Sequence, residues 1–281
     1  MRLAAALVFS IALPVAAQVD SGSALAHYDP AGAAAWWAPL PNSLSEVSGL
    51  ATTASGQLLA HGDERAVIWR FDPIRRHTLA RFGLRGRGRL LRGDFEDIAL
   101  AGERLFLVTE AGEIFEGRAA PDGAVGPARR RSLGLGRGCA VEGLAWDAPS
   151  RSLLMLCKTA RTERWKDHLI VLAISIDTWR LENRPRLLVP PAPIERVTGH
   201  HHFHGTALVR HPRTGTYLVL AGPEHALIEV SASGAVLGGA RLDHEAHRQP
   251  EGMAIGSDLT LFISDEARGR TARITAYAYR P

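Results

Sequence analysis

Five copies of one short phrase place polar side chains at a regular interval along the chain. The phrase reads Val-Ser-Gly-Leu-Ala at 47–51 and Val-Glu-Gly-Leu-Ala at 141–145, and its second position is polar in every copy. If these side chains converge, their three carboxylates repel one another unless a proton or a cation neutralises them. Calcium binds oxygen ligands and tolerates irregular geometry, so we expect a divalent-cation site, with calcium as the first choice. The five positions are Ser48, Glu96, Glu142, His204 and Glu251, and the expected metal ligands are Glu96, Glu142, His204 and Glu251.

The same residues allow two other interpretations. In the structural one, each carboxylate accepts backbone N–H groups of the neighbouring repeat and ties the repeats together. In the other, the residues take a direct part in catalysis. His204 argues against a pure calcium site, because imidazole suits a transition metal better. Glu46 and Asp94 lie two residues upstream in their copies and are further candidates for the site.

A second polar set follows the first. In each copy another apolar run ends in a polar cluster, and one residue of each cluster lies 14 to 20 positions after the first set. Antiparallel neighbours bring the end of the second strand back to the start of the first. We therefore expect two concentric rings of polar side chains around one channel mouth, where a ligand would bind. The second ring comprises Glu64, Glu110, Lys158, Glu224 and Glu266.

The spacing of the copies predicts the architecture that positions these rings. Their second positions are separated by 48, 46, 62 and 47 residues, and short apolar runs with turn residues between them fill each interval. One propeller blade of four antiparallel strands needs about 40 to 50 residues. The sequence therefore predicts an all-β fold, a single propeller of five four-stranded blades. Six blades remain an alternative, because the longest spacing has room for a half-blade; our preferred explanation of that spacing is an insert at Thr162–Asp167.

The N-terminal region divides into three parts. Arg2 precedes an apolar run from Leu3 to Val15 and small residues at the cleavage positions, which predicts a signal peptide over 1–17. Residues 18–32 are expected to form a flexible N-terminus, and 33–281 the propeller domain. Within it, a spare strand at 33–40 would complete the last blade and close the ring. The chain should therefore be exported to the periplasm or secreted. It contains no second run of 18 apolar residues, so no membrane span is predicted.

Export makes a disulfide between Cys139 and Cys157 chemically allowed. In a regular hairpin Cys157 would lie opposite Glu142, which leaves Cys139 three residues further along the strand. That offset is about 10 Å, and a disulfide requires Cα atoms within about 7 Å. Only a bulge or a fold-back of the chain would close the gap, so the sequence leaves the bridge open.

Composition and the remaining motifs narrow the function classes. With 46% apolar residues the chain can bury a core, and two cysteines exclude a disulfide-dense scaffold or a zinc ribbon. Nucleic acid is not an expected partner of an exported chain without a basic helix. The tract at 200–204 places His202 and His204 on one strand face as a second metal candidate. An arginine run predicts either a solvated outer strand or a contact with anionic lipid or polysaccharide, and consists of Arg75, Arg76, Arg81, Arg85, Arg87, Arg89 and Arg92.

The repeated phrases resemble those of a known family. Glu46-Val-Ser-Gly-Leu, Val141-Glu-Gly-Leu-Ala, Pro250-Glu-Gly-Met-Ala and Ser264-Asp-Glu are similar to the SdiA-regulated family of exported β-propellers, and the likeness covers roughly 41–279. The resemblance implies the fold and export but little about chemistry. Phe203-His204-Gly205 departs from the acidic pattern, which puts a uniform acidic ring in doubt.

Two function classes follow. The first is a monomeric envelope propeller that binds a small molecule or an envelope component at an acidic channel mouth, with or without a divalent cation. The alternative is a metal-assisted hydrolase of an ester or phosphoester, in which a cation activates water and one glutamate acts as the base. The chain contains no Gly-x-Ser-x-Gly, His-Glu-x-x-His or phosphate-loop motif, so the sequence favours the binding function.

Overall fold

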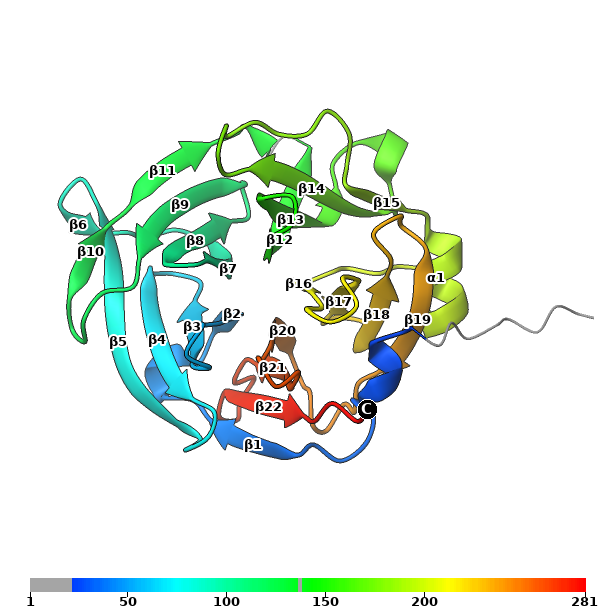
Figure 1. Ribbon diagram of the computed structural model, residues 1–281, viewed down its shortest axis with the longest axis horizontal. Helices are drawn as coiled ribbons and strands as arrows, with labels where there is room; N and C mark the ends of the chain where they lie inside the picture. The colour runs from blue at the N-terminus through cyan, green and yellow to red at the C-terminus, as the bar shows by residue number, and fades with distance from the viewer. Residues whose placement is uncertain (1–21, 136–137) are drawn as a thin grey trace, which may run out of the picture.

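The computed structural model describes residues 22–135 and 138–281. Five antiparallel blades surround a central axis, each with its first strand innermost (Figure 1). The prediction of an all-β propeller with five four-stranded blades is therefore confirmed, and the six-bladed alternative is excluded. The predicted signal peptide, 1–17, lies outside the described residues. No helix in the described residues is long and apolar enough to cross a membrane.

The strands follow one another from the axis outward in each blade. Blade 1 contains β2 (Val47–Thr52), β3 (Leu58–Gly62), β4 (Val67–Asp72) and β5 (His77–Gly86). Blade 2 contains β7 (Phe95–Ala101), β8 (Arg104–Thr109), β9 (Glu113–Arg118) and β11 (Arg129–Ser132). Blade 3 contains β12 (Cys139–Asp147), β13 (Ser152–Ala160), β14 (Leu169–Ser175) and β15 (Leu187–Val189). Blade 4 contains β16 (Ala207–Arg210), β17 (Tyr217–Ala221), β18 (Ala226–Val230) and β19 (Val236–Arg241).

Blade 5 combines strands from the N-terminal and the C-terminal parts of the propeller domain. Its three inner strands are β20 (Pro250–Ile255), β21 (Leu261–Asp265) and β22 (Arg273–Tyr277), and its outer strand is the N-terminal β1 (Trp36–Pro39). β1 pairs antiparallel with β22, with Trp36 opposite Ala276. The prediction that an N-terminal strand closes the ring is confirmed, and the closure removes the open edge that blade 5 would otherwise expose.

The core lies between neighbouring blades. Phe106 of blade 2 packs with Met155 of blade 3, and Leu154 of blade 3 packs with Tyr217 of blade 4. A strand between two such interfaces is buried on both faces, so it reads as a continuous apolar run rather than an alternating one. The run at 153–156, four residues with no exposed side chain, is an example.

A short strand in the connection of blade 2 pairs with the outer strand of blade 1. Between β9 and β11 the chain forms β10 (Val125–Pro127), which pairs parallel with β5 of the preceding blade. A tight turn after β5 leads to β6 (Arg89–Leu90), which pairs back onto β5. β5 is thus the outer strand of blade 1 and carries both additions (Figure 1).

The longest interval between copies has two sources. The insert at 162–167 contains a single turn of 3-10 helix, η4 (Glu163–Trp165). The second source, helix α1 (Pro191–Thr198), lies between β15 and β16 and was not expected from the sequence. The helix begins with proline in its first turn and ends at Gly199 in the left-handed conformation, φ 77°. Both pieces lie outside the four strands of blade 3, so no half-blade is needed.

The residues before β1 pack against blade 4. Glu229 is fully buried on β18 and accepts hydrogen bonds from Ser23 Oγ at 2.5 Å and from the backbone N–H groups of Ala24 and Leu25. The short turn η1 (Leu25–His27) follows directly. Although residues 18–32 were expected to be flexible, the part from Ser23 to Leu25 is held by this buried carboxylate.

Cys139 and Cys157 form a disulfide, with Cα atoms 5.5 Å apart. The pairing of β12 with β13 shifts register twice, between Ala140 and Val141 and between Val141 and Gly143. As a result Cys157 lies opposite Val141 rather than Glu142, which shortens the offset that a regular hairpin would impose. The bulge that the sequence analysis left open therefore brings the two cysteines together.

Candidate functional site

The second position of the phrase lies in a β-bulge in four of the five blades. In blade 1, Val47 pairs with Gly62 and Gly49 with His61, so Ser48 between them has no partner. The same skip occurs at Glu96, Glu142 and Glu251. A bulge bends the strand and redirects the side chain of the unpaired residue. The repeated phrase is thus a structural device that frees one polar side chain per blade at the start of its innermost strand.

The glycine after the bulge is required by space. A Cβ atom at Gly49 would lie 2.5 Å from Oδ1 of Asp97, and one at Gly252 would lie 2.5 Å from Oγ of Ser264. Both distances are shorter than van der Waals contact allows. The innermost strands therefore approach neighbouring strands too closely for a side chain, which explains why glycine recurs in the phrase.

In blade 4 the corresponding residue lies outside the strand. His204 precedes β16, which begins at Ala207. Its Nδ1 lies 2.7 Å from Oε1 of Glu224, and its backbone N–H donates to Oε2 of the same carboxylate at 2.9 Å. The His204–Glu224 pair confirms the expected proximity of the two rings in this blade. His202, the other member of the predicted histidine pair, lies beside His204 with ring centroids 6.1 Å apart and has Nδ1 3.3 Å from Asp167 Oδ1.

Three glutamates from three blades meet around one lysine. Nζ of Lys158 lies 3.2 Å from Oε2 of Glu142 and is also attracted by Glu251 and Glu96. The side chains of Glu96 and Glu142 are hydrogen-bonded across the boundary between blades 2 and 3. The structure thus gathers Glu96, Glu142 and Glu251, together with Lys158 of the second ring, at one mouth of the channel.

The glutamates hold protons more tightly than usual. Burial, followed by repulsion from Glu142 and Asp94, raises the pKa of Glu96 to about 9. Burial also raises the pKa of Glu142 and of Glu251, and the charge of Lys158 opposes the shift in both. At neutral pH Glu96 therefore keeps its proton and can donate it in the hydrogen bond to Glu142. Although burial disfavours the charge of Lys158, attraction by Glu142 raises its pKa.

The second ring extends the acidic region outward. Burial, with repulsion from Glu251, Asp63 and Glu46, raises the pKa of Glu266 to about 7. Glu110 forms an ion pair with Arg161 at 2.7 Å. The pKa of Asp94 is raised mainly by burial and further by repulsion from Glu110. Glu64 is exposed in the loop after β3. Four of the five second-ring residues thus interact with groups of the mouth or with His204, and Glu64 lies at its rim.

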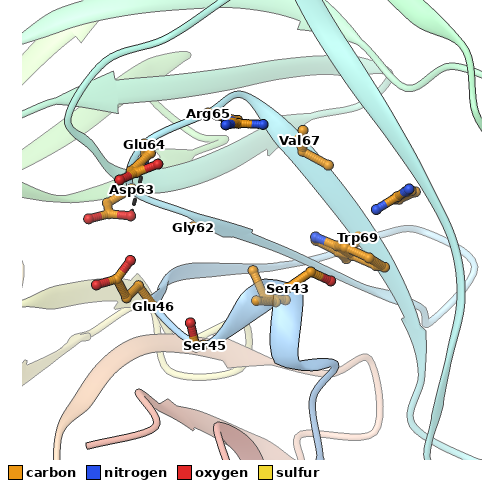
Figure 2. A pocket seen from close by; sticks show the side chains of 11 residues that line it. Ser43, Ser45, Glu46, Gly62, Asp63, Glu64, Arg65, Val67 and Trp69 are labelled. Carbon is orange, nitrogen blue, oxygen red and sulfur yellow. Dashed lines mark hydrogen bonds between the residues drawn. The ribbon is translucent and has the colours of Figure 1, made fainter.

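A pocket of about 260 Å³ adjoins the mouth on the side of blade 1. Figure 2 shows Glu46, Asp63 and Glu64 along one side of it and the indole of Trp69 on the opposite side. Because Glu46 and Asp63 also act on Glu266, the pocket is electrostatically continuous with the acidic mouth.

The opposite end of the channel is different in character. A cavity of about 200 Å³ there is lined by the far ends of all five innermost strands, and most of its lining is apolar, including Leu100, Trp146 and Ile255. The described residues that line this cavity include no carboxylate, so it differs in charge from the mouth where the innermost strands begin.

A residue that the sequence analysis overlooked ties the blades together. Asp97 is buried, and its Oδ2 accepts the backbone N–H of Leu144 in blade 3 at 2.7 Å, while Oδ1 accepts that of Ile98. This is the cross-blade bond that the structural interpretation assigned to the glutamates. The sequence already distinguished this residue, because the blade 2 copy has Asp97 where all four other copies have glycine.

The fit of the mouth to a metal ion can be tested on its donor groups. In residues 22–135 and 138–281, no three His, Cys, Asp or Glu side chains are grouped closely enough to hold a metal ion. A lysine ammonium, rather than open space, lies beside Glu142. The four residues expected to bind calcium also divide into two groups, since the described contacts of His204 are with Glu224 and His202.

Comparison with known proteins identifies the fold. No family model matches the chain, and no curated protein is similar to it in sequence. Among solved structures, glutaminyl cyclase from Myxococcus xanthus is 14% identical with a TM-score of 0.59, over 87% of this chain and 94% of that one. The PQQ-bound aldose sugar dehydrogenase from Streptomyces coelicolor is 13% identical with a TM-score of 0.57, over 88% and 97%. A luciferin-regenerating enzyme is 11% identical with a TM-score of 0.52, over 83% and 91%. At these identities the likeness shows the fold alone.

Proposed function

We propose that the protein is an exported propeller that binds a small, positively charged organic ligand, such as an amine, at the acidic mouth of its channel. The observation that carries this proposal is the meeting of Glu96, Glu142 and Glu251 from three blades around the single ammonium of Lys158. Carboxylates that remain in excess of their basic partners in a half-buried site favour a ligand that brings positive charge.

Proton release would accompany binding. Glu96 is protonated at neutral pH because its ionised form would be buried beside other carboxylates. A ligand ammonium at this position supplies the missing opposite charge, lowers the pKa of Glu96 and favours its ionised form. Affinity should therefore rise with pH from about 6 to about 9, as first Glu266 and then Glu96 lose their protons.

The described geometry supports an organic cation more than a metal ion. An ammonium ligand needs only hydrogen-bond acceptors, and Glu142 and Glu251 offer them without a shared coordination sphere. Calcium takes six to eight oxygen ligands, whereas fewer than three donor side chains are grouped closely enough in the described residues. A divalent cation at the mouth is therefore kept as an arm of the test.

A second candidate function is hydrolysis of an ester or phosphoester. The hydrogen-bonded pair of Glu96 and Glu142 favours it, because one group can donate a proton while the other accepts one. In the metal-assisted form expected from the sequence, a cation would activate the water that attacks the substrate. The thermal-unfolding experiment with calcium chloride, described below, therefore also tests this form.

Export to an oxidising compartment is part of the proposal. The leader predicted over 1–17 supports it, and so does the disulfide between Cys139 and Cys157, since such bonds persist outside the cytosol. The ligand would accordingly be a molecule of the periplasm or the extracellular medium.

Thermal unfolding of the mature protein with ethylamine, putrescine, spermidine or calcium chloride tests the function. A ligand present at about a hundredfold its Kd stabilises the native state by about 2.7 kcal/mol, which raises the Tm of a domain of this size by several degrees. We expect an amine to produce this shift, Glu142→Gln to reduce it, and Ser48→Ala at the matched position of blade 1 to retain it. A shift with calcium alone that Glu142→Gln abolishes would contradict an organic ligand and restore the metal site. The absence of both shifts would contradict cation binding.

A further inference from the structure

The outer side of blade 1 carries an unusual concentration of positive charge. β5 and the turns at its two ends hold the whole arginine run of the sequence, and every member is exposed. We call this surface the basic edge; it consists of Arg75, Arg76, Arg81, Arg85, Arg87, Arg89 and Arg92. It lies on the rim of the propeller, away from the central channel (Figure 1).

Much of this charge is not matched by carboxylates. Arg75 pairs with Asp72 at 3.6 Å, and Arg81 lies over the ring of Trp69. Among the described residues, no ion pair joins a carboxylate to the four arginines of the β5–β6 region, which are Arg85, Arg87, Arg89 and Arg92. The segment 83–93 contains no acidic residue that could supply one. Arg85 Nε donates to the backbone carbonyl of Val125 at 3.3 Å, and the four exposed guanidinium groups keep further N–H donors for an external anion.

Both turns present arginine at positions that disfavour it. Arg76 in the β4–β5 turn has φ 58°, and Arg87 in the β5–β6 turn has φ 49°. Glycine, asparagine and aspartate are the residues that such left-handed positions normally select. The guanidinium of Arg76 lies over the ring of Trp36, so a contact within the protein accounts for arginine at this position. Arg87 is exposed in the other turn.

Apolar side chains are exposed among these arginines. Ile74 is 90% exposed directly beside Arg75, Val125 on β10 is 44% exposed, and Leu79 on β5 is 38% exposed. A soluble anionic polymer gives such side chains nothing to bury against. A lipid surface does, because apolar groups enter the boundary between headgroups and acyl chains while arginines bind the phosphates.

We infer that the basic edge docks the protein on the surface of a bilayer that contains anionic phospholipid. Arginine pairs with phosphate through its planar fork. Ile74, next to Arg75, would insert at the end of β5 opposite Arg85, Arg87 and Arg89. This position leaves the acidic mouth open, because the mouth lies on the axis and the basic edge on the rim. Arg81 of the basic edge also lines the pocket beside the mouth, but the inference uses neither Lys158 nor any glutamate of the mouth.

Vesicle cosedimentation of the mature protein tests the inference. We expect binding to phosphatidylcholine vesicles that contain about one third phosphatidylglycerol, much weaker binding to pure phosphatidylcholine, and release as ionic strength rises from about 0.05 to about 0.5 M. Each arginine removed from the surface should lower partitioning about fivefold, so the triple variant Arg85→Ser, Arg87→Ser, Arg89→Ser should bind about a hundredfold more weakly. Ile74→Ser should weaken binding without any change in charge.

A matched control separates the edge from net charge. Arg164, Arg184 and Arg196 are exposed on the far side of the propeller, and their triple serine variant loses the same charge. It should bind anionic vesicles like the unmodified protein, and circular dichroism should show that both triple variants are folded. Equal loss in the two triple variants, or no binding to anionic vesicles, would overturn the inference. Retention on alginate beads with no effect of Ile74→Ser on any binding would also overturn it, in favour of a polysaccharide partner.

Discussion

Glu96→Gln should change how the stability of the propeller depends on pH. Glutamine keeps the shape of a protonated glutamate and can still donate a hydrogen bond to Glu142, but it cannot ionise. In the unmodified protein, Glu96 holds its proton to about pH 9 when folded, whereas its ordinary pKa is 4.5. Between these values the folded state binds more protons than the unfolded state, so the free energy of unfolding falls as pH rises.

The magnitude follows from one proton. A difference of one bound proton changes the unfolding free energy by about 1.4 kcal/mol per pH unit. The gap between Glu96→Gln and the unmodified protein should therefore widen in favour of the variant by up to about 1.4 kcal/mol per unit, from about pH 5.5 to about pH 8. Glu251 and Glu266 titrate in both proteins, whereas Glu142 is coupled to Glu96, so the difference between the two curves reports the proton held by the Glu96–Glu142 pair.

Urea unfolding followed by tryptophan fluorescence at a series of pH values measures this gap. Ser48→Ala occupies the same bulge position in blade 1 and carries no ionisable group, so its curve should run parallel to that of the unmodified protein. Parallel curves for Glu96→Gln as well would refute the argument, because they would mean that Glu96 ionises at the same pH in the folded and the unfolded chain.

Two further predictions concern the bonds that hold the mouth in place. The double variant Cys139→Ser, Cys157→Ser should lose about 3 kcal/mol of unfolding free energy, because the disulfide closes a loop with a sequence separation of 18; unreduced mature protein with two titratable thiols would contradict the bond. Asp97→Ala should cost about 2 to 4 kcal/mol, since it leaves the buried N–H groups of Leu144 and Ile98 without an acceptor. Asp97→Asn keeps an acceptor oxygen and should cost less, and equal losses in the two variants would contradict this role.

The sequence determined the architecture because each blade repeats the same local solution. A bulge, a glycine at a close approach and an apolar strand recur together, so the copies at 48, 96, 142, 204 and 251 count the blades directly. The spare strand before the first copy predicted how the ring closes. Local pairing also predicted that Glu142 would lie near Lys158 and His204 near Glu224, since each pair belongs to one hairpin.

Relations between blades were decided by the tertiary structure. Which polar residues meet depends on how bulges on separate strands aim their side chains across the axis, and no spacing along the chain encodes that direction. Glu96, Glu142 and Glu251 therefore converge around Lys158, while His204 pairs with Glu224 instead of joining them. The high pKa of Glu96 arises from burial and from charges on other blades, which the chain acquires only when the ring is closed.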